Sequence, residues 1–174
     1  IPCLLGVEGL IADELRFLGA ENVAAENGRV LFSGDENMLA RVNICSHFAE
    51  RVQILMGSFE ATTFEELFQG VKNLPWEEWI GKDDAFPVKG YSLKSKLFSV
   101  SDCQSIIKKA VVERLKSKYG ISWFEETGPI HQIQFSIMKN KVSLLIDTSG
   151  YGLHKRGYRL EANGAPIKET LAAS

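Results

Sequence analysis

Cysteine and histidine are scarce in this sequence. The 174 residues include three cysteines, which are Cys3, Cys45 and Cys103. They are too few for a disulfide framework, and none lies within metal-ligand spacing of another cysteine or of a histidine. We read them as small buried hydrophobic residues. The three histidines, at positions 47, 131 and 154, each occur without a sequence-local nucleophile or ligand, so a small enzyme or a metal site has no local support.

Long hydrophobic runs are missing as well. A helix needs about 20 apolar residues in succession to span a bilayer, and no run approaches that length. Residues 1–5 lack the basic flank of a signal peptide. A hydrophobic content of 45% is enough for one large domain or two small ones. We therefore expect a globular cytosolic protein without membrane contacts.

Charge is unevenly distributed along the chain. Residues 1–84 carry six Lys and Arg against fifteen Asp and Glu, a balance of −9. Residues 85–174 carry fourteen against seven, a balance of +7. Such a split points to a polyanionic partner, such as a nucleic acid, for the second half. A solvated basic face is the alternative.

The first part of the chain predicts a helix and a hairpin. Apolar side chains recur at helical spacing over residues 7–18, and Gly19 follows as a residue that can end the helix. Asn27 and Gly28 then separate two strand-like runs. This dipeptide is typical of a type I′ hairpin turn, in which both central residues have positive φ.

Another helix and strand should complete this unit. Asp35 can cap a helix that reaches about Phe48, with an inner face formed by Met38, Leu39, Val42 and Cys45. Residues 52–56 then resemble a returning strand. With residues 1–5 as a first strand, the order is β-α-β-β-α-β, which is a ferredoxin-like unit.

A second unit should begin near Thr62. Thr63 and Glu66 fit a capping box at the start of a helix that ends near Asn73. Pro75 can open a short helix that follows. Trp76 and Trp79 lie three residues apart on one face of it, and we interpret them as core anchors rather than base-stacking side chains.

Lysines gather in the next segment. Residues 86–91 predict a short strand. Beyond it Lys94 and Lys96 alternate with Leu93 and Leu97, so both ammonium groups should point to one side while the leucines pack on the other.

A long helix should follow these lysines. Ser101 and Gln104 resemble a second capping box, and Gly120 ends the helix after Tyr119. Its N-terminus would offer free N–H groups to a phosphate. Its predicted buried stripe is Ile107, Val111 and Leu115. Lys108, Lys109, Lys116 and Lys118 lie off the stripe, as a basic ridge or as a solubilising face.

The last part of the chain combines a hairpin with a basic run. Residues 133–137 and 142–146 alternate apolar and polar side chains around Lys139 and Asn140, which predicts a hairpin. After a Gly-rich turn come His154, Lys155, Arg156, Tyr158 and Arg159. Cations beside an aromatic ring suit a phosphate chain with stacked bases, although an exposed basic strand end is equally compatible. Residues 165–173 read as the first turns of a helix, so we expect a fragment of a longer protein.

These residues resemble a known family. Residues 147–159, DTSGYGLHKRGYR, followed by APIKETLAA at 165–173, are similar to the junction between the THUMP domain and the methyltransferase domain of bacterial THUMP-containing RNA methyltransferases. The similarity is greatest to the large-subunit ribosomal RNA guanine-N2 methyltransferases, known earlier as N6-adenine-specific DNA methylases. It continues through residues 64–68, 74–79, 86–88, 94–99 and 104–109.

The resemblance implies an α+β protein with a ferredoxin-like domain over residues 1–60 and an RNA-binding THUMP domain over residues 61–159. Residues 160–174 would begin the linker into a Rossmann-like domain that binds S-adenosylmethionine. That domain is absent from the sequence, which has no Gly-rich strand-turn-helix and no Asn/Asp-Pro-Pro-aromatic tetrapeptide. Asp147, Gly150 and Gly152 superficially resemble a cofactor loop, but no helix is predicted after them.

We therefore expect the RNA-binding and positioning portion of an S-adenosylmethionine-dependent RNA methyltransferase, directed at 23S rRNA guanine-N2, with no cofactor or metal of its own. Its partners would be structured RNA and its own catalytic domain, with the oligomeric state left open. The expected RNA contacts are Lys94, Lys96, Lys108, Lys109, His154, Lys155, Arg156, Tyr158 and Arg159. One alternative is a structural module that packs on the catalytic domain or on a protein partner. Another is the same module from a tRNA-directed or N6-adenine methylase-like enzyme.

Overall fold

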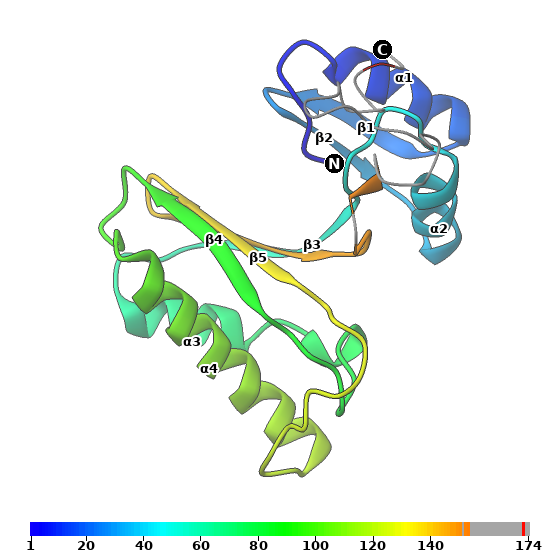
Figure 1. The fold of residues 1–174 in the computed structure, drawn as a ribbon. Helices are drawn as coiled ribbons and strands as arrows, with labels where there is room; N and C mark the ends of the chain where they lie inside the picture. The colour runs from blue at the N-terminus through cyan, green and yellow to red at the C-terminus, as the bar shows by residue number, and fades with distance from the viewer. Residues whose placement is uncertain (151, 154–171, 173–174) are drawn as a thin grey trace, which may run out of the picture. The chain divides into compact units, whose positions relative to one another are not determined.

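Two compact units make up the chain. The computed structural model describes residues 1–150, 152–153 and 172. The first unit is built on Ile1–Gln53 and the second on Ile54–Gly150 (Figure 1). Both combine helices with strands, so the predicted α+β class is confirmed. The basic run from His154 to Arg159 and the helix expected at 165–173 fall outside the described residues, apart from Ala172, which is helical and exposed.

The first unit contains α1 (Glu8–Leu18), β1 (Glu21–Glu26), β2 (Arg29–Ser33) and α2 (Glu36–Cys45). The two strands pair antiparallel, and Pro2 forms a bridge to Arg29 beside them. α1 ends at Gly19, whose φ of +94° is the predicted left-handed conformation. Its buried stripe joins side chains of the hairpin, of α2 and of the segment after α2 in one core, whose larger members are Ile11, Leu15, Val30, Val42 and Val52.

The predicted hairpin at Asn27 and Gly28 is present, but its turn is not type I′. Only Gly28 has a positive φ, +75°. Its N–H donates to Glu8 Oε1 at 2.9 Å, and its carbonyl accepts from the Cys3 N–H at 2.9 Å. These tertiary hydrogen bonds hold the Gly28 peptide in place and outweigh the local preference of the dipeptide.

α2 starts as predicted and ends early. The Asp35 carboxylate accepts from the Met38 N–H at 2.8 Å, which confirms the N-cap. The helix stops at Cys45 because the Glu14 carboxylate accepts hydrogen bonds from the next two residues, from Ser46 Oγ and from the His47 N–H. Cys45 is therefore exposed rather than part of the inner face. Of the three cysteines only Cys103 is buried.

The second unit is a four-stranded sheet of β3 (Gln53–Glu60), β4 (Val88–Leu93), β5 (Ile133–Met138) and β6 (Lys141–Asp147), in the order β3-β6-β5-β4. β5 and β6 form the predicted hairpin, and β4 runs parallel to β5. The expectation that residues 52–56 return to the first unit is wrong. That strand lies beside β6 and completes the second sheet.

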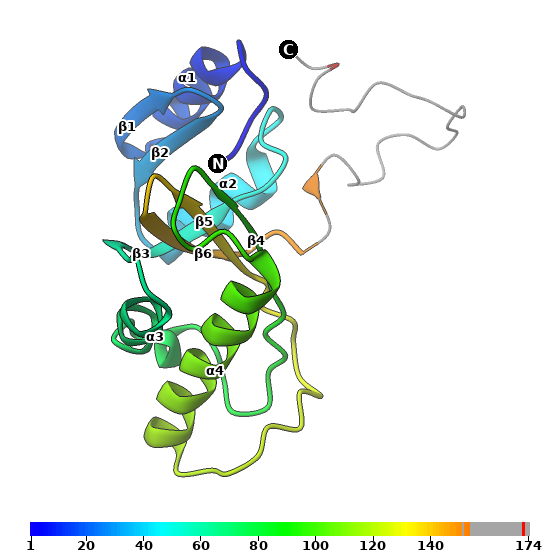
Figure 2. The ribbon, with the colours of Figure 1, turned by 90° about the vertical axis from the view of Figure 1, so that its left-hand side faces the viewer.

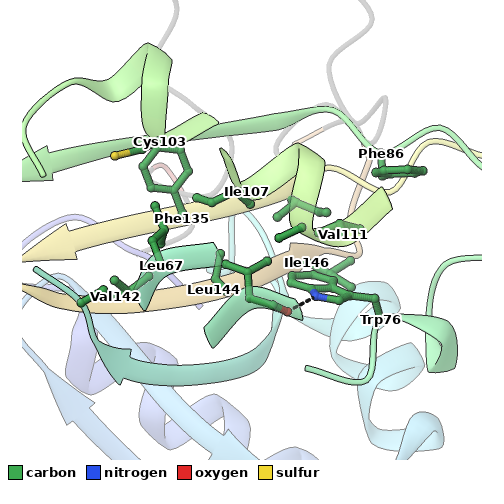
Figure 3. Packing of buried hydrophobic residues seen from close by; sticks show 14 of the residues in the cluster. Leu67, Trp76, Phe86, Cys103, Ile107, Val111, Phe135, Val142, Leu144 and Ile146 are labelled. Carbon is green, nitrogen blue, oxygen red and sulfur yellow. Dashed lines mark hydrogen bonds between the residues drawn. The ribbon is translucent and has the colours of Figure 1, made fainter. Parts of the chain in front are cut away.

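Helices cover one face of this sheet (Figure 2). They are α3 (Phe64–Lys72), the short 3-10 helix η1 (Trp76–Glu78) and α4 (Val100–Tyr119). The capping box of α3 is confirmed, since Thr63 Oγ1 accepts from the Glu66 N–H and Glu66 Oε2 accepts from the Thr63 N–H, both at 3.2 Å. Trp76 is fully buried, as predicted, and its Nε1 donates to the Val71 carbonyl at 2.7 Å (Figure 3). Trp79 is only partly buried.

The start of α4 differs from the prediction. Ile107, Val111 and Leu115 form the buried stripe and Gly120 ends the helix with φ +66°, both as expected. The helix begins at Val100, however, with Ser99 as N-cap and no side-chain cap hydrogen bond. Gln104 does not complete a capping box, because its Nε2 donates instead to the Val88 carbonyl of β4 at 2.9 Å.

Candidate nucleic-acid interface

Two loops meet at one end of the second sheet. β4 ends at Leu93, and residues 94–99 lead from it into α4. Lys139 and Asn140 form the turn between β5 and β6. The loops are joined by hydrogen bonds, in which the Lys96 N–H donates to Asn140 Oδ1 at 2.9 Å and the Asn140 N–H donates to Ser95 Oγ at 3.0 Å. The β4–α4 loop therefore has a fixed position against the turn.

Four lysines are brought together at this junction. Lys94 and Lys96 come from the loop, and Lys139 and Lys141 flank Asn140 in the turn. All four are exposed. Within residues 1–150 none of their ammonium groups forms an ion pair. We call this group the lysine tip.

The lysine tip is not arranged as a continuing strand. Lys94 has a φ of +49°, which breaks the alternation predicted from Leu93 to Leu97. Leu93 is 53% exposed and does not pack on the core, whereas Leu97 is buried. The alternation stops because β4 ends at Leu93, beside the turn between β5 and β6. From there the loop is held by its hydrogen bonds with Asn140.

The N-terminus of α4 lies next to the lysine tip. Val100 begins a 20-residue helix four positions after Lys96. Because Ser99 provides no side-chain cap, the first-turn N–H groups keep the positive end of the helix dipole available to an anion. Asp102, in the same turn, offsets part of this charge.

The two lysines of α4 that were predicted to contact RNA, Lys108 and Lys109, lie away from the lysine tip. Lys108 is eight residues beyond the helix start. Its Nζ forms an ion pair with Glu126, donates to the Phe86 carbonyl at 3.1 Å and sits 3.7 Å from the Phe86 ring centroid. Lys109 is exposed on the α3 side, with its Nζ 6.0 Å from the Phe68 centroid. The two side chains diverge and do not extend the lysine tip.

Further along α4 two of the three basic residues are paired with acid. Arg114 donates twice to Glu77, at 2.9 and 2.5 Å, and Lys118 Nζ lies 3.4 Å from the same carboxylate. The Arg114 hydrogen bonds hold the pKa of Glu77 at about 2, well below its usual 4.5. This end of the predicted basic ridge therefore binds the η1 segment.

The charge balance of the second unit follows the same pattern. Residues 54–84 carry two basic and seven acidic side chains, and residues 85–150 carry ten basic and five acidic, so the unit as a whole is neutral. Within this neutral unit the lysine tip is a local group of four lysines. Within the described residues no group of His, Cys, Asp or Glu could hold a metal ion, and no helix there combines the length and apolarity needed to cross a membrane.

Sequence reasoning missed half of the lysine tip. Lys139 lies in the predicted two-residue turn and Lys141 directly follows it, which was the available local signal. Their proximity to Lys94 and Lys96 depends on the parallel pairing of β4 with β5, across more than forty residues. The predicted contacts His154, Lys155, Arg156, Tyr158 and Arg159 lie outside the described residues.

Two family models match the chain. The THUMP domain model covers residues 61–147, and a ferredoxin-like domain model, that of RlmL, covers residues 1–53. The chain belongs to the THUMP domain family. Its second unit is the THUMP domain, which contains the lysine tip, and the predicted ferredoxin-like domain precedes it.

Relatives of this THUMP protein are named as methyltransferases. YpsC of Bacillus subtilis strain 168, named as an RNA methyltransferase, is 46% identical over 98% of the chain. A ribosomal RNA large subunit methyltransferase K/L of Cellvibrio japonicus is 33% identical over 98% of the chain. The chain spans 44% and 23% of the lengths of these two proteins.

Solved structures show the same fold. A crystal structure described as a predicted N6-adenine-specific DNA methylase, from Listeria monocytogenes, is 50% identical with a TM-score of 0.93, and the match covers 99% of this chain and 45% of that one. SMU.472, described as a methyltransferase and solved in complex with SAH, is 40% identical with a TM-score of 0.89, over 99% of this chain and 46% of that one.

The segment that superficially resembles a cofactor loop begins with a buried carboxylate. Asp147, which superficially suggested a cofactor loop, is 5% exposed at the end of β6, and its Oδ1 accepts from the Ser149 N–H at 2.9 Å. A carboxylate used in this way closes the turn after the strand.

Proposed function

We propose that this chain is the RNA-binding and positioning portion of an S-adenosylmethionine-dependent RNA methyltransferase. Support comes from the THUMP family match and from relatives named as RNA methyltransferases. The single structural observation that carries the proposal is the lysine tip. Four exposed ammonium groups, which have no carboxylate partner within residues 1–150, suit the sugar-phosphate backbone of an RNA.

The fixed geometry of the lysine tip matters as much as its charge. Asn140 accepts a hydrogen bond from the Lys96 N–H and donates one to Ser95 Oγ. These two bonds hold the β4–α4 loop and the β5–β6 turn in one arrangement before any RNA binds. Binding then orders less of the protein, which lowers its entropic cost. Contacts of this kind position a nucleic acid and carry little sequence information by themselves.

The remaining chemistry would belong to other parts of a full-length protein. We propose that S-adenosylmethionine is held by a catalytic domain beyond the described residues, as the SAH-bound relative SMU.472 suggests. The substrate we favour is 23S rRNA, with methylation at guanine N2, in the cytosol. We propose that the ferredoxin-like domain ends near residue 53 and not at residue 60, because β3 lies in the second sheet, and that residues 160–174 lead to the catalytic domain.

The lysine tip can be tested by neutralising two of its members. We expect Lys96→Ala with Lys139→Ala to weaken binding of a structured ribosomal RNA fragment and to make the plot of log K against log salt shallower by about two units, because two phosphate contacts are lost. The measurement is filter retention over a range of salt concentrations, with the 174-residue chain.

A matched control removes the same charge elsewhere in the second unit. Lys82→Ala with Lys116→Ala changes two lysines that do not belong to the lysine tip. Lys116 lies roughly 24 Å along α4 from the start of the helix, at about 1.5 Å per residue. Equal losses in both double variants would contradict a localised site. A lower unfolding temperature for the Lys96 and Lys139 variant would instead support a structural role.

A further inference from the structure

The sheet of the THUMP domain has a second face, opposite α3 and α4 (Figure 1). Side chains alternate across a strand, so those beside the buried residues of β4, β5 and β6 point to this open face. Tyr91 on β4 is 49% exposed there, and its neighbours on the same face, Lys89 and Leu93, are also exposed. The open face is therefore accessible within its own domain.

Strand register orders this face into rows. Tyr91 aligns with Ser136 of β5, and Ser136 aligns with Ser143 of β6. The Ser143 hydroxyl lies 2.8 Å from the hydroxyl of Ser58 on β3. A line of hydroxyl groups thus crosses all four strands, and we call it the hydroxyl row.

The rows on either side of the hydroxyl row each end in a lysine. One aligns Lys89 and Gln134 with Leu145, and the other aligns Leu93 and Met138 with Lys141. Lys141 belongs to the lysine tip, so the open face and the lysine tip form one continuous surface. The three rows across β4, β5 and β6 contain no carboxylate.

We propose that the open face binds an unpaired segment of RNA, with one base stacked on Tyr91 and the sugar-phosphate chain along the hydroxyl row. This deepens the proposed function and rests on it. Hydroxyl groups can contact phosphates and ribose 2′-hydroxyls, and lysines at opposite corners balance the charge of the chain. Four-stranded sheets with helices on the far side and aromatic residues on the open face bind unpaired bases in this way.

A protein partner fits the open face less well. The centre of a protein-protein interface is usually apolar and rich in aromatic residues. Here the central row is polar, and the exposed apolar side chains Leu93 and Met138 form one edge beside Lys141. An unpaired nucleotide can use both kinds of surface, since its base is apolar on its faces and its backbone is charged.

The test compares one RNA strand in two states. An oligouridylate is the unpaired probe, and its duplex with oligoadenylate is the paired probe, both measured by fluorescence anisotropy with the 174-residue chain at low salt. We expect Tyr91→Ala to weaken binding of oligouridylate by roughly 5- to 100-fold, because one stacked base is lost, and to leave duplex binding unchanged. Tyr91→Phe keeps the ring and loses one member of the hydroxyl row, so it should weaken binding less than Tyr91→Ala does.

Controls separate stacking from loss of folding. Trp123→Ala removes another exposed ring, 78% accessible and outside the sheet, and should leave oligouridylate binding unchanged. Tyr91→Leu keeps apolar bulk without an aromatic face and should bind as weakly as Tyr91→Ala. It also provides the test if the alanine variant does not fold.

Other results would overturn the proposal. If Tyr91→Ala and Tyr91→Leu both bind oligouridylate normally while the Lys96 and Lys139 variant loses structured RNA, the proposed function stands and the open face has no part in it. If Tyr91→Ala lowers the unfolding temperature in the absence of RNA and leaves oligouridylate binding intact, the open face packs against protein and does not bind RNA. Failure of the natural chain to bind any of these RNAs would remove the proposed function itself.

Discussion

Asn140 determines how the lysine tip is held. It has a φ of +67°, its Oδ1 accepts from the Lys96 N–H, and its own N–H donates to Ser95 Oγ. Alanine would lose the side-chain hydrogen bond, at about 1 kcal/mol, and would adopt the left-handed conformation at a further cost of about 1 kcal/mol. We expect Asn140→Ala to lower the free energy of unfolding by about 2 kcal/mol, measured by urea denaturation.

Glycine at the same position separates the two contributions. Asn140→Gly also loses the hydrogen bond to Lys96, but glycine accepts positive φ without strain. It should therefore be more stable than Asn140→Ala, while both weaken RNA binding because the β4–α4 loop is released. Equal stabilities of the two variants would show that backbone conformation at this turn contributes nothing.

At the scale of elements, α3 packs on β3 through a glycine. A Cβ added at Gly70 would lie 2.3 Å from Cε2 of Phe59, so the ring would have to move. Alanine favours a helix over glycine by about 1 kcal/mol, whereas overpacking a core contact costs about 1–3 kcal/mol. We expect Gly70→Ala to destabilise the protein in urea denaturation, because the packing cost is the larger.

Two further variants identify the cause. In a Phe59→Leu background the ring is gone, so Gly70→Ala should become neutral or stabilising. Gly9→Ala, in α1, has nothing within 4 Å of the added Cβ and should not destabilise. A loss of stability from Gly70→Ala that persists in the Phe59→Leu background would contradict the proposed clash with the ring.

Elements specified by neighbouring residues could be predicted from the sequence. Asp35 and the Thr63 capping box need only the next three residues, and the β5–β6 hairpin needs only its own alternation. The choice of strand partner is different, because residues 52–56 have the same local pattern whether they pair in the first unit or beside β6. Likewise Ser101 and Gln104 have the spacing of a capping box, but Gln104 binds the Val88 carbonyl, a partner sixteen positions away.

For the molecule as a whole, the charge pattern predicted a polyanion partner but not where it binds. The +7 of residues 85–174 is a sum along the chain, while the folded second unit is neutral. Folding pairs Lys108 with Glu126 and Arg114 with Glu77, and it leaves Lys94 and Lys96 beside Lys139 and Lys141. Only the three-dimensional arrangement separates lysines that support the fold from lysines available to a ligand.

Acid should destabilise the whole protein through carboxylates in both units. Hydrogen bonds from backbone N–H groups lower the pKa of Glu8, Asp35 and Glu66, and Arg114 lowers the pKa of Glu77 to about 2. A carboxylate with a lowered folded-state pKa contributes stability above its unfolded-state pKa, here 4.5 for Glu77, and loses it as pH falls toward the folded value. The unfolding temperature should therefore fall between pH 4.5 and pH 2.

Replacing Glu77 tests its share of this acid dependence. At pH 7 Glu77→Gln should cost about 1 kcal/mol, since the pair with Arg114 is partly exposed. Because glutamine does not titrate, the difference between the variant and the natural protein should shrink as pH falls through the same interval. Thermal unfolding followed by circular dichroism across this pH range measures both curves. A difference that stays constant with pH would mean that Glu77 acts through packing, and that its ionisation does not stabilise the fold.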